Sequence, residues 1–328
     1  MLLKACLRLA DAFFSLHAKG LCYRDISFGN AFIDPESGDV LIADNDNVAI
    51  DREGSVGIRG TERFMAPEIV RGEALPGVDT DLYSLAVLLF YLLMMSHPLE
   101  GRRMLIGDVF GRDEAAKLYG WEALFVLDPD DCSNSPDPER HRSTSTFWGL
   151  YPEMLRRLFT RAFTAGLHHP AERVREGEWR DCMARLLDLL VPCSCGAEVF
   201  VEPDGRPVAD CWRCSSRVLA TEPLSMLVLD PAGERHVVAL NVGRRLFGHH
   251  MRSRRYDYRA AVAEVGRHPE APDVLGIRNL SSDTWSASMQ DGSGATGVAV
   301  LVPPGRSVTI APGTNVDFGL AEGVVEIG

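Results

Sequence analysis

The chain has 328 residues, 46% hydrophobic and 24% charged, a composition typical of globular proteins. This length predicts about two domains. Because 34 Lys and Arg face 46 Asp and Glu, the formal net charge is −12. That charge argues against a nucleic-acid partner, since phosphate contacts require positive surface. The longest purely hydrophobic run, residues 85–95, is too short to cross a bilayer, and the charged, amphipathic N-terminus is not a signal peptide. We therefore expect a cytoplasmic protein with no membrane partner.

The first hundred residues carry clear helix and hairpin patterns. Hydrophobic residues at helical spacing predict a helix over residues 2–16. Two short hydrophobic runs, 31–33 and 40–43, flank a turn that contains Pro and Gly, and they predict a β-hairpin. Residues 82–95 are hydrophobic on nearly every face, so we expect a helix that is buried on all sides.

The pattern later changes from helix to strand. After an irregular insert at 100–146, helical periodicity returns over 152–190. From residue 224 on, short β-branched runs alternate with Gly, Pro, Asn and Asp; they lie at 226–229, 236–240, 298–302, 307–310 and 324–327. Strands at this spacing predict a small all-β sandwich or barrel.

Three polar residues near the N-terminus form an ordered set. Asp25 and Asn30 lie five residues apart in the loop after the first predicted helix, and Asp44 follows a predicted strand 19 residues after Asp25. Phosphoryl transfer needs an acceptor for a hydroxyl proton and two oxygen ligands that hold Mg²⁺ against phosphates. Each residue alone is common in turns, so only the set is informative.

With further motifs, this set resembles the C-terminal lobe of the eukaryotic-type protein kinases over residues 1–190. Tyr-Arg-Asp-Ile-Ser-Phe-Gly-Asn at 23–30 matches the catalytic loop His-Arg-Asp-x-x-x-x-Asn, with Tyr in place of His. The other motifs are Asp-Asn-Asp at 44–46, where Asp-Phe-Gly belongs; Gly-Thr-Glu-Arg-Phe-Met-Ala-Pro-Glu at 60–68, similar to the end of an activation segment; Asp-Leu-Tyr-Ser-Leu at 81–85, the start of the buried central helix; and Pro-Ala-Glu-Arg at 170–173. Five motifs in the family's order argue against a chance match.

The resemblance implies chemical roles for four residues. Asp25 would orient the substrate hydroxyl and accept its proton, whereas Asn30 and Asp44 would hold Mg²⁺ and, with it, ATP. Thr61 would lie beside the catalytic carboxylate and favour Ser and Thr substrates. The alternative for Asp25 is a braced loop carboxylate without catalysis.

Other matched residues would have regulatory or structural roles. Arg24 would bind a phosphate on the activation segment, with Ser55 as a candidate acceptor of that phosphate. Glu68 would pair with Arg173, and Asp81 would brace the catalytic loop.

The chain also departs from the kinase pattern. Ser27 replaces a Lys that touches the γ-phosphate, Asn45 replaces Phe, and Asp46 replaces Gly. No Gly-rich loop, strand Lys or partner Glu precedes Leu2. A start codon placed too late, a fragment, or a domain that does not phosphorylate would each explain this. We favour the first, because residues needed only for chemistry are present. The functional prediction is an ATP-dependent Ser/Thr protein kinase; the alternative is a pseudokinase scaffold that binds signalling partners.

The catalytic loop, Asp44–Asn47, Phe125–Pro129 and Glu178-Trp179 look like a bacterial kinase group. That group is encoded beside von Willebrand A-type proteins and metal-dependent phosphatases. The resemblance implies a phosphorylation switch that acts on protein substrates, with those proteins as partners.

Four cysteines form two close pairs. Cys193 and Cys195 are followed, after 15 residues, by Cys211 and Cys214. Two thiolate pairs fit tetrahedral Zn²⁺, so we predict a structural zinc ribbon, with buried or redox-active thiols as the alternative.

The β-rich tail has a faint resemblance to a forkhead-associated sandwich, which binds phosphothreonine. It rests on Leu275–Ser281, Pro304–Val308 and Pro312–Thr314, and the Arg-rich run 244–259 could read an anion. The overall prediction is an α+β protein with a mainly α-helical kinase C-lobe (1–190, N-lobe absent), a zinc ribbon (191–220) and a β-rich, sandwich-like domain (221–328).

Overall fold

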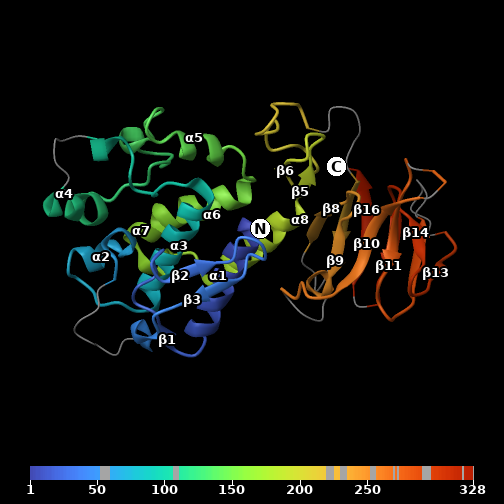
Figure 1. Ribbon diagram of the computed structural model, residues 1–328, viewed down its shortest axis with the longest axis horizontal. Helices are drawn as coiled ribbons and strands as arrows, with labels where there is room; N and C mark the ends of the chain where they lie inside the picture. Colours follow the sequence, from blue (N-terminus) through green and yellow to red (C-terminus); the bar gives the residue numbers. More distant parts are fainter. Residues whose placement is uncertain are drawn as a thin grey trace. The chain divides into compact units, whose positions relative to one another are not determined.

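The chain forms two compact units, Met1–Ala184 and Arg185–Gly328 (Figure 1). The computed structural model describes residues 1–51, 60–105, 111–218, 225–229, 235–251, 256–268, 270–271, 273–289, 297–319 and 321–327. Helices and sheets are both present, as the predicted α+β class requires. Within these residues, no helix is both long and apolar enough to span a bilayer. The domain boundaries near 190 and 220 stay predictions.

The first unit is mainly helical. Its helices are α1 (Leu2–His17), α2 (Pro67–Val70), α3 (Val78–Met94), α4 (Arg112–Ala116), α5 (Arg142–Trp148), α6 (Glu153–Phe163) and α7 (Ala165–His168), and α8 (Glu176–Asp188) begins in it (Figure 1). Hydrophobic residues on every face of α3 are buried, which confirms the prediction as far as Met94; Met95, which follows the helix, is 68% exposed. Phe90 of α3 packs against Phe159 and Phe163 of α6 at ring-centroid distances of 5.1 and 5.7 Å. These aromatic contacts make α3 the core of the unit.

Two small antiparallel ribbons position the loops of the first unit. Strands β1 (Leu21–Cys22) and β4 (Ala49–Ile50) pair with each other. Strands β2 (Ala31–Ile33) and β3 (Val40–Ile42) form the predicted hairpin, in which Ala31 lies opposite Ile42. The residues before β2 and after β3 therefore lie at the same end of this hairpin.

The second unit begins with a short ribbon of β5 (Leu190–Pro192) and β6 (Glu198–Phe200). Two antiparallel sheets follow, one of six strands in the order β13-β12-β15-β16-β7-β8 and one of four in the order β14-β11-β10-β9. Their bounds are β7 Ser225–Leu229, β8 His236–Ala239, β9 Arg245–Phe247, β10 Ala261–Arg267, β11 Leu275–Asn279, β12 Trp285–Met289, β13 Val300–Val302, β14 Ser307–Thr309, β15 Thr314–Asp317 and β16 Glu322–Ile327.

One apolar core joins the two sheets. Val265 and Ile277 of the four-stranded sheet belong to the same buried cluster as Leu227, Trp285 and Val316 of the six-stranded sheet.

The five predicted strand regions coincide with β7, β8, β13, β14 and β16. The structure adds β9–β12 and β15, whose sequences mix hydrophobic residues with Arg, Glu, Ser, Gly and Asn.

Candidate active site

Asp25 is the centre of a group of three polar residues. One carboxylate oxygen, Oδ1, accepts hydrogen bonds from both the backbone N–H and the hydroxyl of Thr61, each at 2.8 Å. The other, Oδ2, accepts a bond of 3.0 Å from the side-chain amide of Asn30. The same amide donates to the Asp25 carbonyl at 2.9 Å. The structure thus brings together Asp25, Asn30 and Thr61, three of the site residues predicted from the sequence.

The β2–β3 hairpin places Asp44 close to this group along the backbone. The backbone N–H of Ala43 donates to the Asn30 carbonyl at 2.9 Å, which sets Asn30 and Asp44 at the same end of the hairpin. Asp44 has a left-handed backbone (φ 59°), and its Oδ2 accepts a bond of 3.0 Å from the Asn47 side chain. Carboxylate and carboxamide oxygens are the ligands that Mg²⁺ prefers, so the donor set fits this ion.

Asp81, at the start of α3, holds the loop that carries Asp25. Its two carboxylate oxygens accept the backbone N–H groups of Tyr23 and Arg24, at 2.6 and 3.1 Å. Asp81 is only 1% exposed. Arg24 adopts a left-handed conformation (φ 68°), which is costly for a residue with a side chain and persists only where the surroundings enforce it. The buried carboxylate supplies that constraint.

His17 is a residue of this site that the sequence patterns did not reveal. Its Nε2 lies 3.1 Å from Asp81 Oδ2, and its Nδ1 is bonded to the carboxylate of Glu176 at the start of α8. Burial by itself would lower the pKa of His17, but hydrogen bonds to Asp81 and Glu176 outweigh it and raise the pKa to about 9. A charged imidazole therefore joins α1, α3 and α8 behind the loop. No local motif connects residues so far apart in sequence.

The side chain of Arg24 contacts the segment that follows Asp44. Its guanidinium donates to the carbonyls of Asp46 and Asn47, both at 3.0 Å. The predicted phosphate acceptor, Ser55, lies outside the described residues. Ser27, at the position of the kinase Lys, is buried, with 4% exposure.

Glu68 and Arg173 form a two-bond ion pair. The guanidinium of Arg173 donates to both carboxylate oxygens of Glu68, at 2.8 and 2.9 Å, and also to the carbonyls of Asp79 and Gly166. Arg173 is almost fully buried. The pair fastens the short helix α2 to the segment before α8.

Comparison with known proteins agrees with this geometry. Residues 2–136 match the family model of the protein kinase domain. Ribosomal protein S6 kinase alpha-4 of Mus musculus is 36% identical over 103 residues, which are 30% of this chain and 13% of that protein. CBL-interacting serine/threonine-protein kinase 24 of Arabidopsis thaliana is 33% identical over 89 residues, which are 26% of this chain and 20% of that protein.

These matches support a eukaryotic-type Ser/Thr protein kinase. A putative protein kinase C delta type homolog of Drosophila melanogaster is also similar, with 37% identity over 90 residues that span 26% of this chain and 13% of that protein. The chain thus spans a fifth or less of the curated kinases that it matches. We refer to Met1–Ala184 as the kinase-like unit.

The hairpin of the kinase-like unit carries two exposed hydrophobic side chains that the sequence analysis did not single out. Phe32 and Leu41 lie opposite each other across β2 and β3 and are 57% and 66% exposed. They follow Asn30 and precede Asp44 along the chain, so an apolar surface adjoins the proposed metal ligands.

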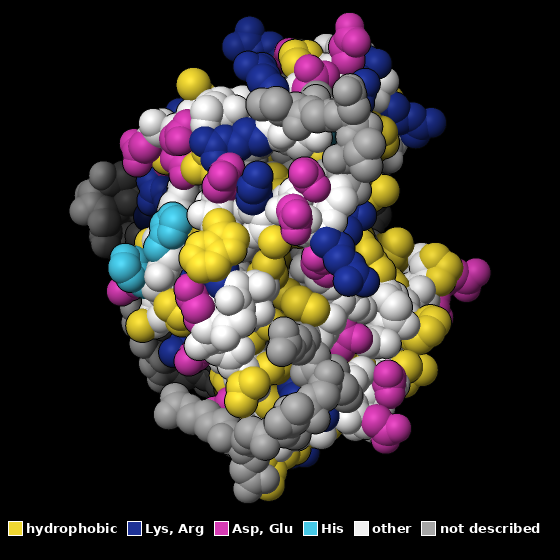
Figure 2. Space-filling view, turned by 90° about the vertical axis from the view of Figure 1, so that its left-hand side faces the viewer, with side chains coloured by type: hydrophobic (Ala, Val, Ile, Leu, Met, Phe, Trp, Pro, Cys, Tyr) yellow, Lys and Arg dark blue, Asp and Glu magenta, His cyan; other side chains and the backbone are white. Residues whose placement is uncertain are grey.

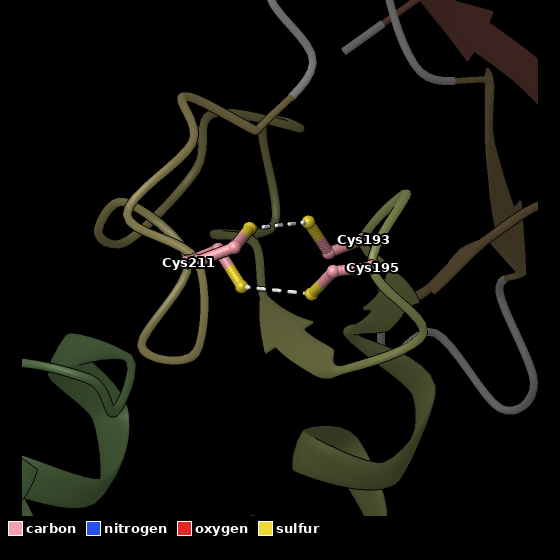
Figure 3. Close-up of side chains that lie close together, drawn as sticks. Cys193, Cys195 and Cys211 are labelled. Atoms are coloured by element: carbon pink, nitrogen blue, oxygen red, sulfur yellow. Dashed lines mark hydrogen bonds between the residues drawn. The ribbon is translucent and has the colours of Figure 1, made fainter.

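The second unit holds the four cysteines in one cluster. Figure 3 shows the thiols of two loops pointing toward each other. Cys193 Sγ lies 3.7 Å from Cys214 Sγ, and Cys195 Sγ lies 3.6 Å from Cys211 Sγ. None of the four forms a disulfide. The four sulfur atoms all lie within 4.8 Å of one another.

The residues behind the forkhead-associated resemblance have structural contacts. Asn279 is buried; its amide donates to the carbonyls of Asp283 and Val302, and its Oδ1 accepts from the backbone and hydroxyl of Ser281. These bonds hold the turn after β11. Part of the Arg-rich run, 252–255, lies outside the described residues.

Proposed function

We propose that the kinase-like unit contains a Ser/Thr kinase active site that transfers the γ-phosphoryl group of ATP to protein hydroxyls. The observation that supports this most is the shared bonding of Asp25 with Asn30 and Thr61. A hydroxyl that takes the place of the Thr61 hydroxyl at Oδ1 would be oriented by this carboxylate. As its oxygen bonds to phosphorus and the bond from phosphorus to the β-phosphate oxygen breaks, the hydroxyl proton passes to Asp25.

Asn30 and Asp44 would hold Mg²⁺, which neutralises charge on the phosphates when it is bound. The exposed side chains of Phe32 and Leu41 offer an apolar face on which the adenine base could pack. His17, Asp81 and the Glu68–Arg173 pair keep the loop and the activation-segment end in place and do not contact the reacting atoms.

A pseudokinase scaffold is the second candidate. The buried Ser27 favours it, because it replaces a Lys that touches the γ-phosphate in kinases. The Asn-Asp pair after Asp44 also favours it, because Asn45 replaces the Phe whose packing sets the active state. In either case the partners that we propose are cytoplasmic proteins. The resemblance to a bacterial group suggests a von Willebrand A-type protein and a metal-dependent phosphatase among them.

Zn²⁺ would be bound by the four cysteines. In a tetrahedral site with Zn–S bonds of about 2.3 Å, neighbouring sulfur atoms lie roughly 3.8 Å apart, close to the two observed separations of 3.6 and 3.7 Å. The site would be structural, because four thiolates leave no open position for a substrate. Cys211→Ser should remove about one equivalent of zinc, whereas Cys132→Ser, at an exposed thiol outside the cluster, should not.

The kinase proposal is tested by Mg²⁺-ATP binding and by autophosphorylation of the full chain and of a form extended upstream. Asp44→Asn should weaken Mg²⁺-dependent nucleotide binding at least about tenfold and abolish phosphorylation, because it removes a charged ligand of the metal. Asp130→Asn makes the same charge change at an exposed loop position and should change neither. Binding without phosphorylation in both forms would favour the scaffold, and full activity of Asp44→Asn would refute the metal assignment.

A further inference from the structure

The second unit contains a second cluster of possible metal ligands, separate from the cysteines. Asp188 at the end of α8, His236 in β8, and His249 and His250 in the short helix η8 (Gly248–His250) each contribute one ligand atom. These four atoms lie within 4.8 Å of one another. Asp188 and His250 are buried, and His236 is nearly so. No motif in the sequence signals the cluster, because its members are up to 62 residues apart.

The three imidazole rings are arranged around a common centre. Their centroids are 5.3 Å apart for His236 and His249, 5.6 Å for His236 and His250, and 5.1 Å for His249 and His250. Rings bound to one tetrahedral metal through nitrogens at about 2.0–2.1 Å have centroids roughly 5 Å apart. The observed separations match that spacing.

Among the described residues, no Lys or Arg forms an ion pair with the carboxylate of Asp188. Its Oδ2 lies 2.7 Å from His236 Nε2, and its Oδ1 lies 3.0 Å from His250 Nε2. Arg244 is nearby, but its guanidinium donates to the carbonyls of Ala239, Leu187 and Leu190. Within the described part of the chain, the ion pairs of Asp188 are therefore with imidazoles alone. A carboxylate that is 2% exposed is costly to bury without a cation, and a divalent metal would supply one.

A neighbouring hydroxyl also lacks a partner. Tyr258 Oη is buried without a hydrogen bond among the described residues, and its ring lies 5.0 Å from that of His249. Buried polar atoms are usually bonded, so an orphaned hydroxyl beside the cluster is an independent sign of a further bound species at this place.

Four hydrogen bonds oppose metal binding and must be weighed against it. Two are the bonds from the Nε2 atoms of His236 and His250 to Asp188, and two involve backbone N–H groups. Nδ1 of His250 accepts the backbone N–H of Phe247 at 2.9 Å, and Nδ1 of His249 accepts that of Tyr256 at 3.0 Å. A neutral ring in this arrangement carries its proton on Nε2, so binding through Nε2 moves the proton to Nδ1 and breaks both bonds. A closed site with four protein ligands contributes more free energy than four such bonds, so the exchange favours the metal.

We propose that Asp188, His236, His249 and His250 form a second, closed binding site for a divalent transition-metal ion of the Zn²⁺ class. Three imidazoles and one carboxylate are a ligand set that suits this class of ion. Since all four positions are filled by protein, the ion is structural. It joins the end of α8 to β8 and η8 within the second unit, and it is independent of any kinase activity.

Metal content separates this site from the cysteine site. The full chain, purified without chelators or nickel resin, should contain two equivalents of metal by mass spectrometry. Cys211→Ser and His236→Gln should each contain one, and the double variant none. His268→Gln, an exposed histidine outside the cluster, should keep both. Unchanged metal content in His236→Gln would overturn the proposal, and so would an absence of metal in Cys211→Ser.

A direct titration covers the case in which His236→Gln fails to fold. Metal-free Cys211→Ser chain is titrated with Co²⁺, whose visible bands report the ligands. One equivalent should bind with bands of nitrogen and oxygen ligation and without a thiolate charge-transfer band. In the Zn²⁺-loaded chain, which is diamagnetic, the histidine ¹⁵N signals should show the proton moving from Nε2 to Nδ1. Failure to bind Co²⁺ and Zn²⁺ would mean that the cluster is a hydrogen-bonded carboxylate clamp.

Discussion

At the scale of single residues, His17 shows how a titratable group can support the proposed active site without touching it. Its pKa is 6.5 as a free side chain and about 9 in the folded chain, because the hydrogen bonds to Asp81 and Glu176 outweigh burial. Since the folded value lies above the unfolded one, the stabilisation is fully present below pH 6.5 and is lost as the pH rises through about 9. The shift corresponds to an upper bound of about 3 kcal/mol.

We therefore predict that His17→Gln lowers the free energy of unfolding most at pH 6 and by about 3 kcal/mol less at pH 10. Urea denaturation of the full chain at the two pH values measures this difference. His168→Gln, at an exposed position in α7, serves as the control and should show no such pH dependence. If His17→Gln lowers the free energy of unfolding by the same amount at both pH values, the imidazole acts only by packing.

The Glu68–Arg173 pair makes a second prediction at this scale. Removing one partner leaves a charge that is mostly buried and unpaired, so Arg173→Ala should cost about 3–5 kcal/mol. Arg173→Lys keeps the charge but cannot make both bonds to Glu68, so it should cost less. Denaturant unfolding gives both values. Equal costs for Ala and Lys would mean that geometry, and not charge, accounts for the whole effect.

At the scale of elements, the segment that carries Thr61 depends on a glycine. Gly60 has a φ of +98°, and a Cβ there would lie 2.9 Å from the carbonyl oxygen of Arg24. Gly60→Ala should therefore displace Thr61 from Asp25 and reduce phosphoryl transfer or, in a scaffold, Mg²⁺-ATP binding. Gly72→Ala is the matched control, because Gly72 has a φ of +73° and a Cβ added to it would meet no described atom within 4 Å.

Both glycine variants should lose roughly 1–2 kcal/mol of stability from the left-handed backbone. Only Gly60→Ala should also change nucleotide binding or activity, measured at a temperature where both variants are folded. If the two variants lose function equally, the contact between Gly60 and the Arg24 carbonyl has no functional role.

Local patterns were sufficient for some elements and insufficient for others. The β2–β3 hairpin and helix α3 follow from turn residues and from continuous hydrophobicity, which are local signals. Strand β12, Trp285–Met289, was missed because it contains no β-branched residue, although its hydrophobic and polar residues alternate; it is stabilised by pairing with β13 and β15. Likewise, Asp25 and Asn30 are visible in one motif, whereas the partnership of Asp188 with His236 arises from packing between distant segments.

At the scale of the whole molecule, positive and negative side chains are mixed on the face shown in Figure 2. Acidic and basic side chains alternate there among hydrophobic ones. A net charge of −12 with this mixed distribution does not favour phosphate backbones as ligands. This face therefore gives no support to a nucleic-acid partner.

The apolar core of the second unit is made of that unit's own residues, and both proposed metal sites belong to it, so we predict that metal removal destabilises this unit. Scanning calorimetry of the full chain should show two transitions, of which a chelator lowers one. Arg173→Ala identifies the other: a loss of about 3 kcal/mol in the kinase-like unit should lower its midpoint by roughly 6–12 °C and leave the metal-dependent transition in place. A single transition that responds to both changes would show that the two units unfold together, in which case the metals of the second unit would also stabilise the loop that carries Asp25.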